Sequence, residues 1–322
     1  MRKEQVIIIG GGPCGLSAAI ACMDRGLDPL VIEKENVVNS IYNYPTHQTF
    51  FSTSEKLEIG GVAFMTEERK PRRNQALVYY RDVVKRKNIR IHSYERVLSV
   101  KKYVEGFTVD TTNDTYEANF VIVATGYYDS PNLMNIPGED QDHVYHYFKE
   151  AHPFFDMDVV VIGGKNSAVD ASLELEKAGA RVTNLYRGSH YSNSVKPWIL
   201  PEFEALVRHG KIGMEFEASI KEITATHVIY EVNSIEKKIK ADAVFAMTGY
   251  HPDHTFIQSM GVSVDSETGR PFFEPESMET NVEGLYIAGV IAAGNDANEI
   301  FIENGRFHGG LIAKHIVEMD ND

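Results

Sequence analysis

One supersecondary pattern occurs twice in this 322-residue chain, and it limits the possible folds more than any other feature. In each copy a short apolar run leads directly into glycines, at residues 6–15 and again at 159–168. A helical spacing of apolar residues follows, and then a second β-rich run at 30–32 and at 181–185. This order is typical of βαβ units with buried parallel strands. We therefore predict an α/β protein with two dinucleotide-binding, Rossmann-like domains.

The first glycine-rich turn has the residues that dinucleotide binding requires. A strand that turns sharply into a helix presents unpaired N–H groups and the positive end of the helix dipole to an anion. Gly10, Gly12 and Gly15 match the G-x-G-x-x-G pattern, which lets a pyrophosphate approach the backbone. Glu33 follows at the end of the second strand, where a carboxylate accepts hydrogen bonds from ribose hydroxyls.

The second turn departs from this pattern in a way that bears on the choice of nucleotide. Lys165 and Ala168 replace the second and third glycines, although a lysine ammonium can itself contact phosphate. Tyr186 and Arg187 stand at the end of the second strand, so no carboxylate is available there for a free ribose 2′-hydroxyl. Arginine suits a 2′-phosphate, which favours NADPH over NADH. The alternative for Arg187 is an ordinary solvated side chain.

Composition excludes several classes of partner and site. Lys plus Arg number 32 and Asp plus Glu number 46, and the resulting net charge of −14 disfavours nucleic acid and anionic membranes as partners. Cys14 and Cys22 are the only cysteines, which excludes a disulfide scaffold and a cysteine-rich metal site and is typical of a reducing cytoplasm. We expect no metal site, no export signal and no membrane span.

Two further segments extend the pattern to the whole chain. Residues 121–126 and 284–289, together with the two turns, resemble the two-dinucleotide-binding-domain flavoproteins in the size class of thioredoxin reductases. The resemblance implies FAD on the first unit, NADPH on the second and a homo-oligomer. It also implies an NADPH-binding domain inserted in a discontinuous FAD-binding domain. The expected boundaries are 1–126 and 249–322 for the FAD-binding domain and 127–248 for the NADPH-binding domain.

The chain lacks the redox pair of thioredoxin reductases. His146 and Lys149 stand where that family carries its C-x-x-C cysteines, and no C-x-x-C occurs elsewhere. Cys14 and Cys22 are eight residues apart in one predicted helix, which separates them by ~12 Å along its axis. A disulfide requires Cα atoms within ~7 Å, so we expect no bond between them. Reduction of thioredoxin through an internal dithiol is therefore excluded.

A narrower resemblance accounts for this departure. Residues 10–15, 163–168 and 300–309 resemble the YpdA-type bacillithiol disulfide reductases, including the cysteine in the first turn and the lysine in the second. The resemblance implies a cytoplasmic FAD enzyme that uses NADPH to reduce the disulfide of bacillithiol, a small-molecule thiol.

Two roles are open for Cys14: it is either a catalytic nucleophile or a small residue that packs in the core. A thiol at a helix N-terminus has its thiolate favoured by the dipole, which suits attack on a disulfide. Cys14 would then hold half of the substrate as a mixed disulfide that the reduced flavin resolves. Cys22 lies further into the helix and is expected to be an inert core residue.

The wider flavoprotein class has an aspartate at the position of Val290 that binds the flavin ribityl chain; this chain lacks that aspartate, and Asn295 or Asp296 is the candidate substitute. The residues expected to contact FAD are Gly10, Gly12, Pro13, Gly15, Glu33, Lys34, Thr125, Gly126, Gly289 and Val290. Those expected to contact NADPH are Gly163, Gly164, Lys165, Asn166, Ser167, Ala168 and Arg187.

Three other functions remain open at this point. A ferredoxin–NADP reductase of the same type also lacks the cysteine pair, but such enzymes usually carry a C-terminal extension, and this chain stops at Asp322. A flavin monooxygenase is suggested by Pro137-Gly138-Glu139 and by residues 143–147. The third is a non-enzymatic redox sensor that binds both cofactors.

Overall fold

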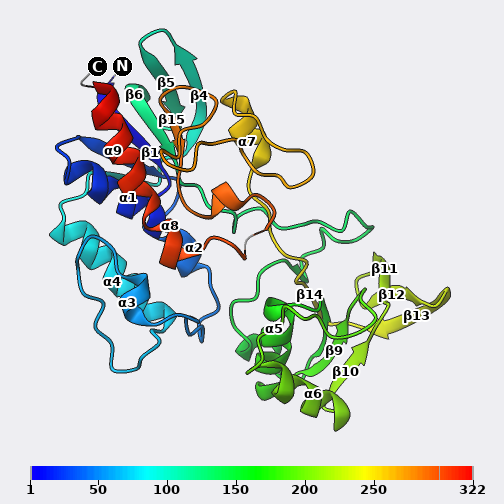
Figure 1. Cartoon of the computed structure of the whole chain (residues 1–322). Helices are drawn as coiled ribbons and strands as arrows, with labels where there is room; N and C mark the ends of the chain where they lie inside the picture. Colours follow the sequence, from blue (N-terminus) through cyan, green and yellow to red (C-terminus); the bar gives the residue numbers. More distant parts are fainter. Residues whose placement is uncertain (1, 297, 321–322) are drawn as a thin grey trace. The chain divides into compact units, whose positions relative to one another are not determined.

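The computed structural model describes residues 2–296 and 298–320, and these form two compact units. Unit 1 combines the chain before residue 131 with the chain after residue 249, and unit 2 is the segment 131–249 (Figure 1). Each unit contains one of the two glycine-rich turns. The assignment of one cofactor to each unit stays a prediction.

Unit 1 is built on a seven-stranded sheet with the order β3-β2-β1-β6-β5-β4, and β15 also pairs with β6. Its strands are β1 (Arg2–Ile9), β2 (Pro29–Glu33), β3 (Ile91–Ser93), β4 (Val97–Tyr103), β5 (Gly106–Thr111), β6 (Thr115–Val123) and β15 (Leu285–Ile287). Its helices are α1 (Pro13–Met23), α2 (Asn39–Tyr42), α3 (Ser54–Leu57), α4 (Arg73–Arg86), α7 (His254–Ser259), η2 (Val290–Ala293), α8 (Ile302–Gly305) and α9 (His308–Asp320).

The two halves of unit 1 are joined through β6. Its Thr115–Ala118 end pairs antiparallel with β5, and its Val121–Val123 end pairs parallel with β15, which lies more than 160 residues later in the sequence. β1 pairs parallel with both β2 and β6. Figure 1 shows the red helix α9 beside the blue helix α1 on this sheet, and the two helices are in contact. The first and last parts of the described chain therefore share one core.

The first βαβ unit forms for local reasons that the sequence displays. Residues 6–9 are completely or almost completely buried, as expected for a central parallel strand. Pro13 is the first residue of α1, where its missing N–H costs no hydrogen bond. Gly26 has a φ of +82° just after the helix, and this left-handed conformation ends it at low cost.

Unit 2 repeats the arrangement in a five-stranded parallel sheet of order β10-β9-β8-β14-β7, to which a three-stranded antiparallel sheet β11-β12-β13 is added. Its strands are β7 (Val144–Tyr145), β8 (Asp158–Ile162), β9 (Arg181–Leu185), β10 (Ile212–Glu215), β11 (Ser219–Ile223), β12 (His227–Val232), β13 (Ile235–Lys240) and β14 (Ala243–Ala246). Its helices are η1 (His152–Phe154), α5 (Asn166–Lys177) and α6 (Leu200–Arg208). Unit 2 has hydrophobic cores of its own.

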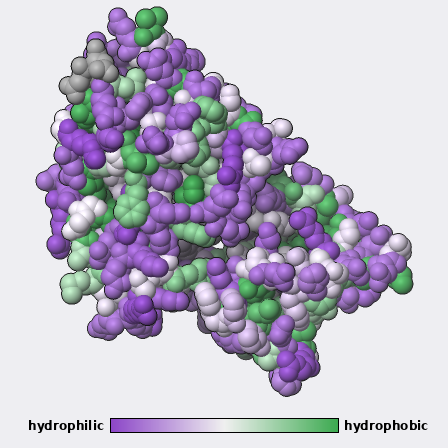
Figure 2. Space-filling model, in the orientation of Figure 1, coloured by the Kyte–Doolittle hydropathy of each residue, from purple (hydrophilic) through white to green (hydrophobic). Residues whose placement is uncertain are grey.

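The face of the molecule in Figure 2 is mainly hydrophilic, with hydrophobic residues scattered among hydrophilic ones. Of the helices in the described ranges, none is long and apolar enough to cross a membrane. Within the same ranges, no group of three or more His, Cys, Asp or Glu residues is placed to hold a metal ion.

Candidate cofactor and thiol sites

The turn between β1 and α1 requires glycine at two positions and leaves space at a third. Gly10 has a φ of +111°, and a Cβ there would lie 2.5 Å from the carbonyl oxygen of Ala124. A Cβ on Gly15 would collide with the carbonyl oxygen of Gly10. A Cβ on Gly12, in contrast, would meet no described atom within 4 Å. Gly12 therefore faces open space at the N-terminus of α1, where N–H groups without helical partners can bind phosphate.

Glu33 lies beside this turn. Its carboxylate accepts hydrogen bonds from the N–H groups of Gly11 at 2.6 Å and of Glu35 at 2.9 Å, and the side chain is buried. Burial raises the pKa of Glu33, while these two backbone hydrogen bonds oppose the shift. The carboxylate thus joins the end of β2 to the glycine-rich turn. Lys34, the next residue, forms an ion pair with Asp129 at 2.8 Å.

The other predicted FAD contacts follow the carboxyl ends of two neighbouring strands. Thr125 and Gly126 follow β6, and Gly126 has a φ of +72°. Gly289 and Val290 follow β15, which pairs with β6. Because the carboxyl ends of parallel strands meet at one edge of a sheet, these residues share the edge that carries the Gly10–Gly15 turn.

Cys14 is the second residue of α1, and its thiol packs against two glycines that are remote in the sequence. Its Sγ lies 3.1 Å from the position of a Cβ on Gly289 and 3.0 Å from that of a Cβ on Gly305. Burial raises the pKa of Cys14 to about 12, and the Glu303 carboxylate contributes in the same direction. Burial therefore acts against the helix dipole, which favours the thiolate.

Cys22 lies in the core of unit 1 and is completely buried. Burial raises its pKa to about 12 as well. Both cysteines are free thiols, as their separation along α1 predicted. The choice between a catalytic and a packing role for Cys14 stays open in this geometry.

Two residues near Cys14 were not singled out individually in the sequence. The Gly289 N–H donates to Nδ1 of His308 at 3.1 Å, and burial lowers the pKa of His308. Glu303 accepts a hydrogen bond from the hydroxyl of Ser52. Both residues belong to the 300–309 motif, so the motif was the available signal. Their roles depend on contacts with residues about 20 and 250 positions away in the chain.

The second turn, in unit 2, has a related geometry with one difference. Gly163 has a φ of +142°, and a Cβ there would lie 2.5 Å from the carbonyl oxygen of Met247. The ring of Tyr186 packs against Gly164, where any Cβ would overlap it. Tyr186 thus stands beside the second turn much as Glu33 stands beside the first. The second turn consequently has an aromatic ring where the first has a carboxylate.

Asn166 fixes a neighbouring loop. Its Nδ2 donates to the carbonyl oxygen of Ser194 at 2.9 Å, and its Oδ1 accepts from the N–H of Lys196 at 2.8 Å. The amide is thus used to hold residues 194–196 at the start of α5. Of the other predicted contacts here, Lys165 and Ser167 are exposed and Ala168 is buried.

Arg187 follows β9 and is exposed. Within residues 2–296 and 298–320, its guanidinium has no hydrogen-bond or ion-pair partner. An exposed guanidinium at the end of the second strand is available to bind an anion.

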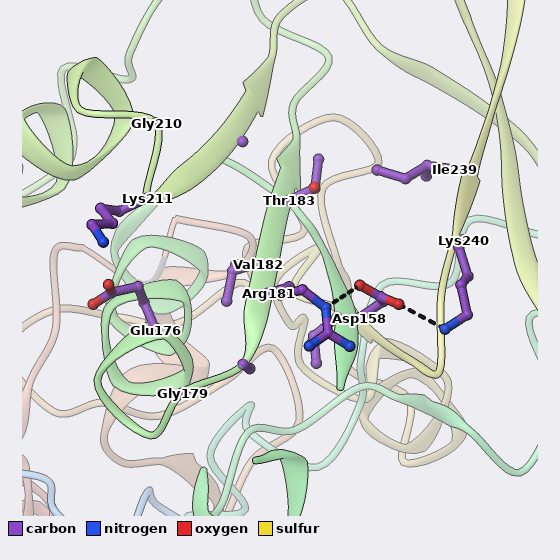
Figure 3. Close-up of a pocket in the computed structure, with 13 residues that line it drawn as sticks. Asp158, Glu176, Gly179, Arg181, Val182, Thr183, Gly210, Lys211, Ile239 and Lys240 are labelled. Atoms are coloured by element: carbon purple, nitrogen blue, oxygen red, sulfur yellow. Dashed lines mark hydrogen bonds and ion pairs between the residues drawn. The ribbon is translucent and has the colours of Figure 1, made fainter. Parts of the chain in front are cut away.

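The cavity of about 410 Å³ in Figure 3 lies in unit 2 away from this turn. It is lined by the first residues of β8 and β9, and so lies at the amino ends of these strands. Asp158 accepts hydrogen bonds from Arg181 and Lys240, each at 2.7 Å, and they hold the pKa of Asp158 below its usual value. Arg181 and Lys240 are therefore both paired with Asp158, and none of the predicted site residues lines the cavity.

Comparison with known proteins identifies the family. Residues 7–289 match the model of the pyridine nucleotide-disulphide oxidoreductases. The chain belongs to this family. Bacilliredoxin reductase Bdr from Bacillus subtilis is 66% identical and aligns over 100% of both proteins.

Two solved structures are closely similar to this chain. Bacillithiol disulfide reductase Bdr (YpdA) from Bacillus cereus has 65% identity and a TM-score of 0.97, over 99% of this chain and 100% of that one. The Staphylococcus aureus protein of the same name has 60% identity and a TM-score of 0.96, over 99% of each chain. These matches confirm the predicted fold class, the resemblance to the YpdA-type proteins and the assignment to the oxidoreductases.

Proposed function

We propose that this chain is an NADPH-dependent flavoprotein that reduces bacillithiol disulfide. One disulfide, one NADPH and one proton would give two bacillithiol thiols and NADP⁺. The observation that carries this proposal is the 60–65% identity, over essentially the full length, with two proteins named bacillithiol disulfide reductase.

The geometry of unit 1 supports FAD as its cofactor. The open space at Gly12, the free N–H groups of the first turn of α1 and the carboxylate of Glu33 fit a pyrophosphate and a ribose. Bound flavin would accept a hydride from NADPH and pass two electrons to the disulfide. Gly289, Val290 and Lys34 stay predicted contacts with this cofactor.

The geometry of unit 2 supports NADPH. The turn at Gly163 presents the N-terminus of α5, and Lys165 and Arg187 are exposed beside it. Tyr186 rather than a carboxylate packs on the turn, which disfavours recognition of a free ribose 2′-hydroxyl.

Cys14 is the proposed nucleophile within this function. Its thiolate would attack one sulfur of the substrate, form a mixed disulfide and release the other half as a thiolate that takes up a proton. Burial raises the pKa of Cys14, so the attack would require groups that favour the thiolate once cofactor and substrate bind.

The test is NADPH oxidation by the purified, FAD-loaded protein under anaerobic conditions, with the thiol produced measured directly. We expect two thiols per NADPH with bacillithiol disulfide and much slower turnover with glutathione disulfide, cystine and coenzyme A disulfide. Rapid reduction of ferredoxin without disulfide-dependent turnover would support the alternative ferredoxin–NADP reductase instead. Incorporation of oxygen in air would indicate a monooxygenase, and no turnover with any acceptor would indicate a sensor.

Two variants separate the activity from the covalent step. Cys14→Ala should abolish disulfide-dependent turnover, whereas Cys22→Ala, in the same helix, should retain it. Full turnover in Cys14→Ala would support the proposed activity but would show that it does not pass through a mixed disulfide with Cys14.

The Bacillus subtilis relative is named for a second substrate class, bacilliredoxin. A bacilliredoxin carrying a mixed disulfide therefore belongs in the same assay, and a higher kcat/KM for it would make the protein disulfide the preferred substrate.

Homo-oligomerisation and a cytoplasmic location stay predictions. Light scattering after gel filtration tests the first, and cell fractionation tests the second.

A further inference from the structure

Residues 188–196 form a loop after β9 that is fastened to the N-terminus of α5, where the proposed NADPH site begins. Asn166 is the first residue of α5, and both polar atoms of its amide bind this loop. Nδ2 donates to the carbonyl oxygen of Ser194 at 2.9 Å, and Oδ1 accepts from the N–H of Lys196 at 2.8 Å. One side-chain amide therefore holds two backbone groups that lie 28 and 30 residues further along the chain.

Other contacts hold the same loop to the remainder of unit 2. The ring of Tyr191 makes edge contacts with the rings of Phe203 in α6 and of Phe216, with centroid distances of 6.0 and 5.1 Å. Val195 is buried in a hydrophobic core of unit 2. These contacts fasten the 188–196 loop to α6 and to the core, and Asn166 joins it to the first turn of α5.

The groups around this junction suit a phosphate. The first N–H groups of α5 have no helical partners, and the helix dipole favours an anion there. Lys165, the residue before Asn166, is exposed, and so is Arg187, the residue before the loop. The hydroxyls of Ser192 and Ser194 are hydrogen-bonded to each other at 2.8 Å in the part of the loop that Asn166 holds. Asn166 thus joins the helix terminus to a loop that carries further hydrogen-bond donors.

We propose that Asn166 positions the 188–196 loop as a wall of the pyrophosphate site and does not itself bind the nucleotide. Both polar atoms of the amide are already used by the loop. A loop that is fixed before binding avoids the entropy cost of ordering it when the nucleotide arrives. The pyrophosphate is common to NADPH and NADH, so Asn166 contributes equally to the binding of both. Asn166 is thus a positioning residue, and this inference rests on the proposed function for the identity of the ligand.

The experiment compares Asn166→Ala with the parent, both as the full-length, FAD-loaded chain. Alanine is favourable in a helix, so the substitution removes the two hydrogen bonds and leaves α5 intact. Glu176→Ala, in the last turn of the same helix, is the matched control. Calorimetry gives the Kd for NADP⁺ and for NAD⁺. Hydrogen exchange measured by mass spectrometry without nucleotide reports how firmly residues 188–196 are held.

We expect Asn166→Ala to raise the Kd for NADP⁺ and for NAD⁺ by the same factor, about five- to tenfold, because two hydrogen bonds that order the loop are lost. Exchange in residues 188–196 should be faster than in the parent, and Glu176→Ala should match the parent in both measurements. Faster exchange with unchanged Kd values would overturn the proposal, because the loop would then not serve the nucleotide. Raised Kd values with unchanged exchange would overturn it as well, because Asn166 would then be a direct ligand. A rise for NADP⁺ alone would place its effect at the 2′-phosphate and also contradict the proposal.

Tyr191→Ala provides a second test if Asn166→Ala does not fold. It releases the same loop from α6 and leaves the groups at the N-terminus of α5 unchanged. Exchange in residues 188–196 should again be faster and both Kd values higher, and unchanged Kd values would count against the proposal. Absence of turnover with bacillithiol disulfide, together with nucleotide binding that depends on Asn166, would refute the proposed function and leave this inference intact. A parent chain that binds neither nucleotide would overturn this inference.

Discussion

The contact between His308 and Gly289 is possible only while Nδ1 of the imidazole carries no proton, because Nδ1 accepts the Gly289 N–H. Burial disfavours the charged imidazolium and lowers the pKa of His308 below its usual 6.5. As the pH falls through 6.5, the unfolded chain therefore takes up a proton at this residue before the folded chain does. The contribution of His308 to stability is present above that pH and is lost below it.

His308→Asn should weaken this pH dependence, because an asparagine Oδ1 is an acceptor that does not titrate in this range. We expect the free energy of unfolding in urea to fall less between pH 7 and pH 5 in the variant than in the parent. His209→Asn, at an exposed position of unit 2, serves as the control and should keep the parent slope. Equal slopes for the parent and His308→Asn would show that His308 does not titrate on unfolding.

At the scale of the element, two glycines of the turn between β1 and α1 should respond differently to substitution. Gly10 is required by the backbone of the fold, whereas Gly12 would be required only for binding FAD. Gly12→Ala fits the backbone, since Gly12 has a φ of −74° and open space at its Cβ position. We expect this variant to keep its circular dichroism spectrum but to lose FAD affinity about tenfold or more, because one lost phosphate contact is worth ~1.5 kcal/mol. Gly10→Ala should fail to fold. Full flavin content in purified Gly12→Ala would contradict the proposed site.

We propose that Arg187, which follows β9, gives the preference for NADPH over NADH. Arg187→Ala should raise the KM for NADPH about tenfold and leave the KM for NADH nearly unchanged, because the lost charge meets only the 2′-phosphate. Arg208→Ala, which removes an exposed arginine from α6, should change neither value. A similar rise in KM for both nucleotides would show that Arg187 contacts a part of the cofactor that NADPH and NADH share.

The two βαβ units could be predicted because their signals are local. Apolar runs, glycines and helical spacing lie within about 30 residues, and the strand predicted at 181–185 is the strand observed. The antiparallel strands β4–β5 and β11–β13 were not predicted. β13, for example, is rich in lysine and mostly exposed or half-buried, so it lacks a buried apolar run.

The candidate site could be predicted less completely, because its contacts join residues that are far apart in the sequence. The pKa of Cys14 depends on Gly289, Gly305 and Glu303, which approach α1 only through the fold. A helix N-terminus is visible in a sequence, whereas the burial that outweighs its dipole is not. The amide of Asn166 likewise holds a loop about 30 residues away, which no local pattern indicates.

At the scale of the whole molecule, the two units differ in how they are assembled from the chain. Unit 2 is one continuous segment with complete sheets and cores of its own. We expect residues 131–249 expressed alone to unfold cooperatively in urea, followed by the fluorescence of Trp198, the single tryptophan. Residues 1–130 alone should not fold, because they lack β15 and α9. Non-cooperative unfolding of the 131–249 fragment would mean that unit 2 needs the rest of the chain.

The pairing of β6 with β15 also has a consequence during translation. Unit 2 consists of 119 residues, from 131 to 249, and the ribosome must make them before it reaches β15. At about 5–20 residues per second this takes roughly 6–24 s. Throughout that interval β15 is missing from the edge of β6 that it pairs with at Val121–Val123, and an open strand edge is a template for pairing with other chains. The nascent chain is therefore most exposed to aggregation while unit 2 is being synthesised, and chaperones have that interval in which to protect it.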